Sequence, residues 1–327
     1  MKKTLAKILT LMLLLSAAGC SAETTPKNSD SAKAIQVGLV QLADNGAFTD
    51  MREGFIDKLR ELGYTEEQLV IDYKNANGDT ATLNSIFQTM VDAQKDLIVT
   101  IGTPATQAIV NMDSGIPVFF ISVSNPVGAK VITDMSTPDK HATGTSNAIP
   151  VSEMFKLSDQ LTPDRQTYGL IYNTGEVNAV TTIEQAKNYL DSVGLNYKEA
   201  IVTSSSEVQQ AAESLVGSVD AFFIPNDSMV QSAMPQVAEI AKLAKLPVYG
   251  SSAVMVQSGA FATVSIDDIT IGGITAEMAV KFLKGTPIEQ IPAITVSDFT
   301  TVINQSTADA IGVTIPQDIL SHAAIIE

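Results

Sequence analysis

The sequence of 327 residues is poor in the residue types that most often build metal and redox sites. It contains one cysteine, two histidines and no tryptophan. A single cysteine excludes an intramolecular disulfide, so the stability of the fold must come from packing. His141 and His322 lie far apart in the sequence, and neither has metal-ligand residues at a suitable spacing. We therefore predict no metal site and no cofactor.

Positive charge is also scarce. The chain has 20 lysines and arginines against 36 acidic residues, a formal net charge of −16. This balance argues against a nucleic-acid partner, because binding phosphates requires basic residues. It also argues against electrostatic adhesion to anionic lipid. The acidity is sufficiently explained by the solubility of an exported protein.

Motifs of common enzymes are missing as well. The sequence has no phosphate-binding loop, no nucleophile elbow and no dinucleotide-binding glycine fingerprint. A serine hydrolase would need a base that the sequence does not supply. The pair Gly272-Gly273 lies within a helical pattern, and we interpret it as a site of close packing. We predict a protein that is not an enzyme and has no catalytic residues.

The N-terminus has the three-part layout of a secretory signal. A basic region with Lys2, Lys3 and Lys7 precedes a mostly apolar run over 8–15, and small residues fill 16–19. The apolar run is too short to span a bilayer, which takes about 20 residues.

Cys20 follows this segment directly. Residues 15–20 resemble the lipobox of bacterial lipoproteins, although Ala17 stands where leucine is commonest. The resemblance implies removal of the signal peptide, 1–19, and attachment of lipid to Cys20. An ordinary buried cysteine is the alternative. Residues 20–33 are polar and have no hydrophobic period, which predicts a flexible tether and an extracytoplasmic, lipid-anchored location.

The first half of the remaining chain alternates short apolar runs with amphipathic helical patterns. Strands are predicted at 34–40, 70–73, 97–101 and 118–121, and helices at 49–62, 79–94 and 103–112. This order predicts a parallel sheet with helices on both faces.

The same pattern then restarts. Strands are predicted at 168–172, 200–202, 221–224, 247–249 and 260–265, and helices at 177–193, 207–216 and 229–244. The fold class is therefore α/β, with two doubly wound parallel-sheet units that meet near 144–150, after an irregular loop at 122–141. Ligands bind beyond the carboxyl ends of parallel strands, so two facing units would form a cleft.

Several segments resemble one family of ABC transporter solute-binding proteins, usually described as tryptophan/tyrosine-type. They are 43–55, 102–106, 124–127, 172–178, 225–228 and 259–264. The resemblance covers nearly all of the chain after the tether. It depends on the order and spacing of these segments, since no single motif is decisive.

The resemblance implies the type I periplasmic-binding-protein fold, with two lobes joined by three crossing strands. The N-terminal lobe would comprise 34–146 plus 267–295, including a returning helix at 269–283. The C-terminal lobe would comprise 147–266 plus 296–327.

The resemblance also implies a function. A monomer would capture an aromatic amino acid (tryptophan, tyrosine or phenylalanine) between its lobes and deliver it to a membrane permease with its ATPase. The alternative is a ligand-sensing binding protein for another small solute, such as a nucleoside, a sugar or another amino acid.

A free amino acid needs a site for its carboxylate, a partner for its ammonium group and a side-chain pocket. Thr103, Thr106 and Ser124 suit the carboxylate, since they lie near a helix start. Asp227 is the predicted partner of the ammonium group, and Glu176 is a second candidate. Each residue that begins a helix has the alternative role of capping it.

Neutral side chains complete the predicted site. Four amides can orient the ligand without burying charge: Asn45, Asn173, Asn178 and Asn226. Phe48 or Tyr172 could stack on an aromatic ligand, although packing in the core is the commoner role of such residues. Residues 251–253 are uncharged, whereas several relatives carry a charge there. The sequence therefore does not predict which residues line the side-chain end of the pocket.

Overall fold

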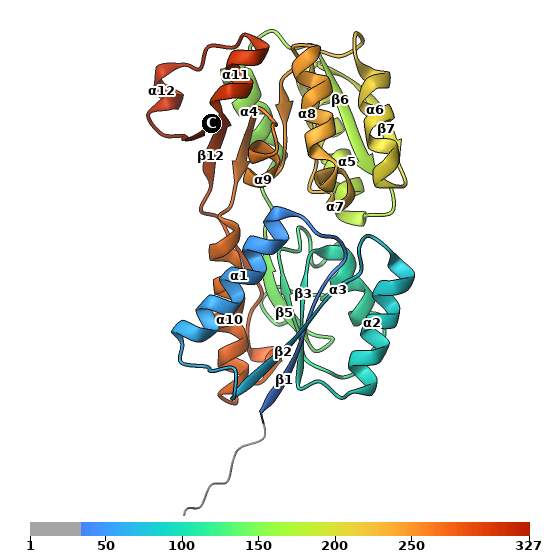
Figure 1. Cartoon of the computed structure of the whole chain (residues 1–327), viewed down its shortest axis with the longest axis vertical. Coiled ribbons are helices and arrows are strands. Elements are labelled where there is room, and N and C mark those ends of the chain that lie inside the picture. Colours follow the sequence, from blue (N-terminus) through green and yellow to red (C-terminus); the bar gives the residue numbers. More distant parts are fainter. Residues whose placement is uncertain (1–33) are drawn as a thin grey trace, which may run out of the picture. The chain divides into compact units, whose positions relative to one another are not determined.

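The structure is a computed structural model that describes residues 34–327. The predicted signal peptide, tether and Cys20 lie outside the described residues. Among residues 34–327, no helix is long and apolar enough to cross a membrane. Two sheets, each flanked by helices, organise this part of the chain (Figure 1), and the predicted α/β class with two parallel-sheet units is confirmed.

The first sheet has six strands in the order β11-β5-β4-β3-β1-β2, and their pairings are parallel. The strands are β1 (Ile35–Gln41), β2 (Leu69–Asn75), β3 (Leu97–Ile101), β4 (Val118–Ile121), β5 (Ala142–Ser146) and β11 (Ile294–Thr295). Helices α1 (Gly46–Glu61) and α10 (Asp268–Leu283) cover one face, and α2 (Thr80–Asp92) and α3 (Thr103–Val110) cover the other. Leu39 and Val40 point to opposite faces and are both fully buried.

The second sheet has seven strands in the order β13-β12-β10-β9-β8-β6-β7. They are β6 (Thr167–Asn173), β7 (Asn196–Val202), β8 (Ala221–Phe223), β9 (Val248–Tyr249), β10 (Ala262–Ser265), β12 (Thr300–Asn304) and β13 (Ala324–Ile326). The helices that accompany it are α4 (Val151–Leu161), α5 (Val177–Val193), α6 (Val208–Leu215), α7 (Ser228–Ser232), α8 (Met234–Leu243), α9 (Ala253–Gln257), α11 (Gln305–Ile311) and α12 (Gln317–Leu320).

This second sheet is not wholly parallel, because β12 runs antiparallel to β10. The reason lies in the connections. The chain leaves β10 toward the first sheet and returns from β11, so β12 enters the second sheet from the end at which β10 leaves it.

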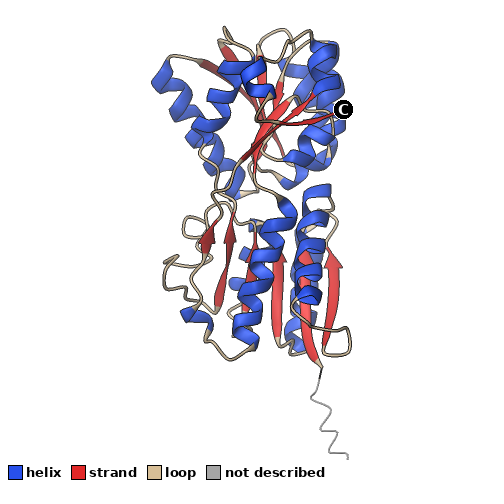
Figure 2. Ribbon diagram, turned by 90° about the vertical axis from the view of Figure 1, so that its left-hand side faces the viewer, coloured by secondary structure: helices blue, strands red, loops and turns tan. Residues whose placement is uncertain are grey.

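The chain passes between the two sheets three times, at 147–150, 266–267 and 296–299 (Figure 2). These crossings are short segments outside the regular strands. We call the part around each sheet a lobe. Our proposed boundaries are unchanged, with 34–146 plus 267–295 in the N-terminal lobe and 147–266 plus 296–327 in the C-terminal lobe.

Two predicted helices differ from the structure. The single helix predicted at 229–244 is wrong, since the chain forms α7 and α8 with a break at Ala233. Pro235, in the first turn of α8, has no N–H to continue the preceding helix. The helix predicted at 207–216 begins instead with a 3₁₀ turn at Ser205–Glu207 and continues as α6. A second 3₁₀ turn, Ile288–Gln290, precedes β11.

Helices α1 and α10 pack unusually closely through glycine. A Cβ atom on Gly272 would lie 2.1 Å from the carbonyl oxygen of Met51, and one on Gly54 would lie 2.2 Å from that of Ile269. Gly273 is looser, because a Cβ there would lie at ordinary contact distances, 3.5 Å from the Lys58 side chain and 3.8 Å from the Gly54 carbonyl oxygen. The close packing predicted for this glycine pair is confirmed at Gly272. The two closely packed helices both begin at the edge of the first lobe that faces the second lobe (Figure 1).

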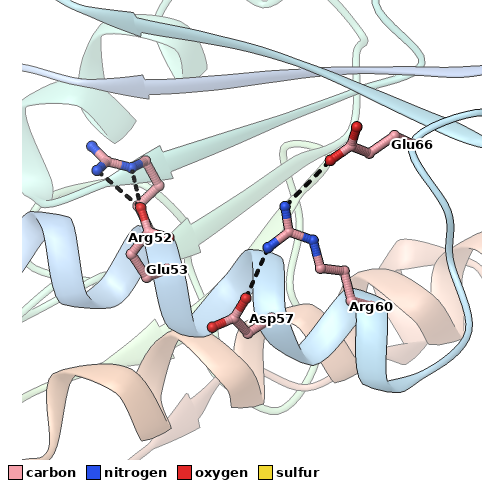
Figure 3. Close-up of polar contacts among 5 residues, drawn as sticks. All are labelled: Arg52, Glu53, Asp57, Arg60 and Glu66. Atoms are coloured by element: carbon pink, nitrogen blue, oxygen red, sulfur yellow. Dashed lines mark hydrogen bonds and ion pairs between the residues drawn. The ribbon is translucent and has the colours of Figure 1, made fainter.

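Two arginines of α1 contact acidic residues nearby (Figure 3). Arg52 contacts Glu53 at 3.1 Å, and Arg60 contacts Asp57 at 2.9 Å and Glu66 at 3.4 Å. Exposed pairs of this kind contribute little to stability, about 0–1 kcal/mol each.

Candidate functional site

A cavity with two chambers lies between the lobes. The larger chamber encloses about 270 Å³ and the narrow chamber about 30 Å³. Six residues line both: Ser124, Asn147, Ile149, Asn178, Asn226 and Ser251. The lining comes mainly from loops that follow the carboxyl ends of strands, such as β3, β4, β8 and β9, as expected for parallel sheets. The size is at the lower end of small-molecule sites, about 300–1,000 Å³.

Asn45 connects the lobes at the narrow chamber. Its Oδ1 accepts the N–H of Phe48 at 2.9 Å and thereby caps α1, and it also accepts Nε2 of Gln231 at 2.8 Å from the other lobe. These two bonds fix the orientation of the amide. The Nδ2 group is buried and has no partner among the described residues, so it can donate to a ligand.

Thr103 begins α3 in the same chamber. Its side chain is 2% exposed, and its Oγ1 has no hydrogen-bond partner among residues 34–327. The preceding residue, Gly102, has a φ of 82°, and a Cβ there would lie 2.9 Å from Cζ of Phe48. Glycine is therefore needed both for the backbone conformation and for the close approach of the Phe48 ring.

Asn178, near the start of α5, supplies a third unpaired atom. Its Nδ2 donates to the carbonyl of Asn226, which fixes the amide and leaves Oδ1 buried and without a partner in the described part of the chain. Residues 34–327 contain five such buried side-chain atoms, and three of them, on Asn45, Thr103 and Asn178, line the narrow chamber. Because unpaired buried polar groups are unfavourable, this concentration indicates a ligand-binding site.

Asp227 lines the narrow chamber, but its carboxylate already accepts three backbone N–H groups. They belong to Met229 at 3.1 Å, Val230 at 3.0 Å and Asn173 at 2.6 Å. Asp227 thus caps α7 and fastens the end of β6 to it. Burial raises the pKa of Asp227 above its ordinary value, although these N–H groups oppose the shift.

Glu176 lies beside Asp227 and not in the lining of either chamber. Both of its carboxylate oxygens lie 3.1 Å from the N–H of Ser228. Burial, and then the charge of Asp227, raise the pKa of Glu176 to about 8. The native protein therefore holds a proton here at a pH at which an unfolded chain has released it.

We expect this proton to make stability depend on pH. The contribution of Glu176 to stability should be complete below its unfolded pKa of about 4.5 and should be lost as the pH rises toward 8, by about 1.4 kcal/mol per pH unit at most, because the folded state binds more protons. Melting curves from pH 5 to pH 9 should show a shallower fall for Glu176→Gln than for the wild type. Glu184→Gln, at an exposed position of the same helix, is the matched control. Equal slopes for all three proteins would contradict the assignment.

Both polar and apolar side chains line the larger chamber. The apolar ones include Met135, Met154, Phe223, Val264 and Pro126. At the junction with the narrow chamber, the hydroxyl of Ser124 donates to Oδ1 of Asn147 at 3.0 Å. No lysine, arginine or histidine lines either chamber. The cavity therefore offers polar groups, including the carboxylates of Asp227 and Asp268, in the narrow chamber and apolar surface in the larger one.

The structure brings together most of the residues predicted from the sequence. Seven of them line the narrow chamber: Asn45, Phe48, Thr103, Ser124, Asn178, Asn226 and Asp227. Three others lie outside both chambers. Thr106 is directed inward to Thr100 and Gly102, while Asn173 and Glu176 line a separate hollow beside α2 and α3. Tyr172, considered for stacking, also lies outside the lining, and its hydroxyl donates to Glu199.

Sequence reasoning missed several lining residues. They are Ser122, Asn147, Gln231, Ser252, Ser265 and Asp268. Ser122 directly follows β4, so its place at the carboxyl end of a predicted strand was an available signal. Gln231 and Ser252 bond to each other at 2.9 Å, and Gln231 also bonds to Asn45. This connection between separate loops has no signature in the sequence.

Comparison with known proteins gives consistent matches. A model of the family described as ABC transporter substrate binding protein matches residues 36–326. A tyrosine-binding protein of Clostridioides difficile (strain R20291) is 33% identical over 294 residues, which cover 90% of this chain and 85% of that relative.

Two solved structures are similar over 90% of this chain. An ABC domain from Streptococcus pneumonia in complex with L-Trp has 31% identity and a TM-score of 0.86, with 100% of that chain covered. The ligand-free, open structure of a substrate-binding protein with adhesive properties from Clostridium difficile has 33% identity and a TM-score of 0.68, with 99% of that chain covered.

Proposed function

This chain belongs to the ABC transporter substrate-binding protein family, and we propose that its ligand is an aromatic amino acid held between the two lobes. Members of the family are extracytoplasmic, non-catalytic components that bind a small ligand and work with an ABC permease and ATPase. The fold is that of type I periplasmic binding proteins.

The observation that carries the proposal is the set of unpaired polar atoms in the narrow chamber. Asn45 Nδ2 is a donor, Asn178 Oδ1 is an acceptor, and Thr103 Oγ1 can be either. Together they match a zwitterion, which presents a carboxylate and an ammonium group on the same α-carbon. The free N–H groups at the start of α3 would assist with the carboxylate.

The larger chamber would hold the side chain of the ligand. Met135, Met154 and Phe223 provide apolar and polarizable surface for a ring. Phe48, packed against Gly102, would contact the ligand near its α-carbon. The tyrosine-binding protein of Clostridioides difficile and the complex of the Streptococcus pneumonia domain with L-Trp support an aromatic amino acid as the ligand.

The ten residues predicted from the sequence have two proposed roles. The seven that line the narrow chamber would contact the ligand or shape its site. Thr106, Asn173 and Glu176 would support the loops that carry these contacts, because each bonds to a neighbouring loop or helix start.

A ligand screen by thermal shift tests the function. We expect L-tyrosine, L-tryptophan or L-phenylalanine to raise the melting temperature of the wild type. At a ligand concentration of 100 times the dissociation constant, binding adds about 3 kcal/mol to the free energy of unfolding. Ribose, myo-inositol, uridine and L-leucine serve as comparison ligands. A shift with one of these and with none of the aromatic amino acids would favour the alternative, a binding protein for another solute.

We further propose that the protein is exported, loses residues 1–19 and is anchored as a monomer through lipid on Cys20. A tethered binding protein would remain near its permease while its lobes move. Cys20→Ser should release the protein from the membrane fraction, whereas continued association with membranes would contradict lipid anchoring.

A dimeric mass in size-exclusion chromatography with light scattering would contradict the monomer.

A further inference from the structure

Asp268 is a carboxylate in the narrow chamber that was not predicted from the sequence. It is the first residue of α10, is half-buried, and lines the chamber together with Asn45, Thr103 and Asn178. Its neighbour Asp267 caps α10 by accepting the N–H of Thr270 at 2.6 Å. The capping role is therefore already filled, and Asp268 is available for another one.

The surroundings of Asp268 are negative. Burial, followed by the charges of Asp50 on α1 and of Asp267, raises the pKa of Asp268 well above its ordinary value. The residues described contain no ion pair to Asp50, Asp267 or Asp268. Arg52, on the adjacent turn of α1, lies instead over the ring of Tyr73 and against Glu53. A cation entering the chamber would relieve this repulsion.

Asp227, the other carboxylate that lines the narrow chamber, and its neighbour Glu176 are occupied. Asp227 accepts three backbone N–H groups, and Glu176 accepts that of Ser228. Asp268 differs because no hydrogen bond from the protein stabilises its charged form. Of these three carboxylates, Asp268 is therefore the one without a partner among the described residues.

The unpaired polar atoms of the narrow chamber are a separate indication of which chemical group pairs with Asp268. Asn178 Oδ1, on a side chain that is 8% exposed, is an acceptor in need of a donor, and Thr103 Oγ1 on a 2% exposed side chain is also unpaired. The chamber encloses about 30 Å³, room for a small polar group and not for a ring. An ammonium group has three donors and a positive charge, so it fits both Asp268 and Asn178.

We propose that Asp268 pairs with the ammonium group of the bound amino acid, with Asn178 Oδ1 as a second acceptor. The inference rests on the proposed function and makes it more specific. It moves the ammonium contact from Asp227, in the second lobe, to the start of α10 in the first lobe. Asp227 keeps the role of holding α7 and the end of β6.

Pairs of ligands with and without an ammonium group test this assignment. The probes are L-tyrosine, L-tryptophan and L-phenylalanine, and their analogues without the amino group, 3-(4-hydroxyphenyl)propanoate, indole-3-propanoate and 3-phenylpropanoate. Calorimetry should show that Asp268→Asn weakens binding of the amino acids about 100-fold. The same variant should change binding of the analogues by less than about 3-fold.

Two control variants separate charge from structure. Asp267→Asn changes the adjacent carboxylate but keeps a capping residue, and it should bind all probes as the wild type does. Asp227→Asn should lower the melting temperature without discriminating between amino acids and analogues. Unliganded Asp268→Asn should melt at a higher temperature than the wild type at pH 7.5, because an unpaired carboxylate has been removed.

The outcomes are distinguishable. Equal weakening of amino acids and analogues by Asp268→Asn, or no weakening of either, would overturn the role of Asp268 while leaving the proposed function intact. If the wild type binds none of the three amino acids, the proposed function fails. Tyramine and tryptamine then test Asp268 alone: binding that is lost in Asp268→Asn supports an amine site, and absence of binding overturns it.

Discussion

Gly272→Ala is expected to lower the melting temperature by several degrees, although alanine is the better helix former. In an open helix the substitution would stabilise by about 1 kcal/mol. Here the new Cβ would lie 2.1 Å from the Met51 carbonyl oxygen, a backbone atom that cannot rotate away. Helices α1 and α10 must therefore separate, and overpacking of this kind costs about 1–3 kcal/mol or more.

Gly273→Ala is the matched control for this effect. It lies in the same helix, next to Gly272, and its Cβ would make only ordinary contacts, at 3.5 Å to the flexible Lys58 side chain and 3.8 Å to the Gly54 carbonyl oxygen. We expect the control to be neutral or stabilising, as helix propensity predicts. Thermal melting of both variants gives the comparison, and a destabilised Gly273→Ala together with an unaffected Gly272→Ala would contradict the packing geometry. Gly272→Ala should also weaken ligand binding, because Asn45 and Asp268 lie at the starts of the two displaced helices.

Asn178→Ala is expected to weaken amino-acid binding by about 10- to 100-fold. A hydrogen bond to a charged group contributes about 1.5–3 kcal/mol, and each 1.4 kcal/mol corresponds to a factor of ten in the dissociation constant. The variant removes the unpaired Oδ1 acceptor and also releases the Asn226 carbonyl from Nδ2. The second change should loosen the loop between β8 and α7.

Asn188→Ala is the control for this prediction, since Asn188 lies on the same helix at an exposed position. Isothermal titration of both variants with the amino acid that binds the wild type best measures the effect. If Asn178→Ala binds within twofold of the wild type, Asn178 is not a ligand contact.

Much of the site could be predicted because it follows a simple rule. Polar residues after the carboxyl ends of parallel strands meet at one edge of a sheet, which is why Thr103, Asn226 and Asp227 could be placed from the sequence. Thr106 shows where the rule stops. It lies one turn further into α3, and its hydroxyl bonds inward to the Gly102 carbonyl and to Thr100.

Asp268 shows a different limit. It belongs to a helix that returns to the first lobe after the chain has built most of the second. Its distance in sequence from Asn45 and Thr103 gives no local sign of their proximity. Resemblance to a family predicted the return of the chain, but only the structure shows that the start of α10 opens onto the cavity.

The return of α10 also determines when the first lobe can fold. Ile271, Met278 and Val280 of α10 belong to the same buried cluster as Phe55 and Leu59 of α1 and the inner face of the first sheet. Until residue 280 is available, that cluster has an open apolar side. Forming it requires closing a loop of more than two hundred residues, which slows folding. The first lobe therefore cannot be completed as the chain emerges, and its core closes only after nearly the whole sequence has been made.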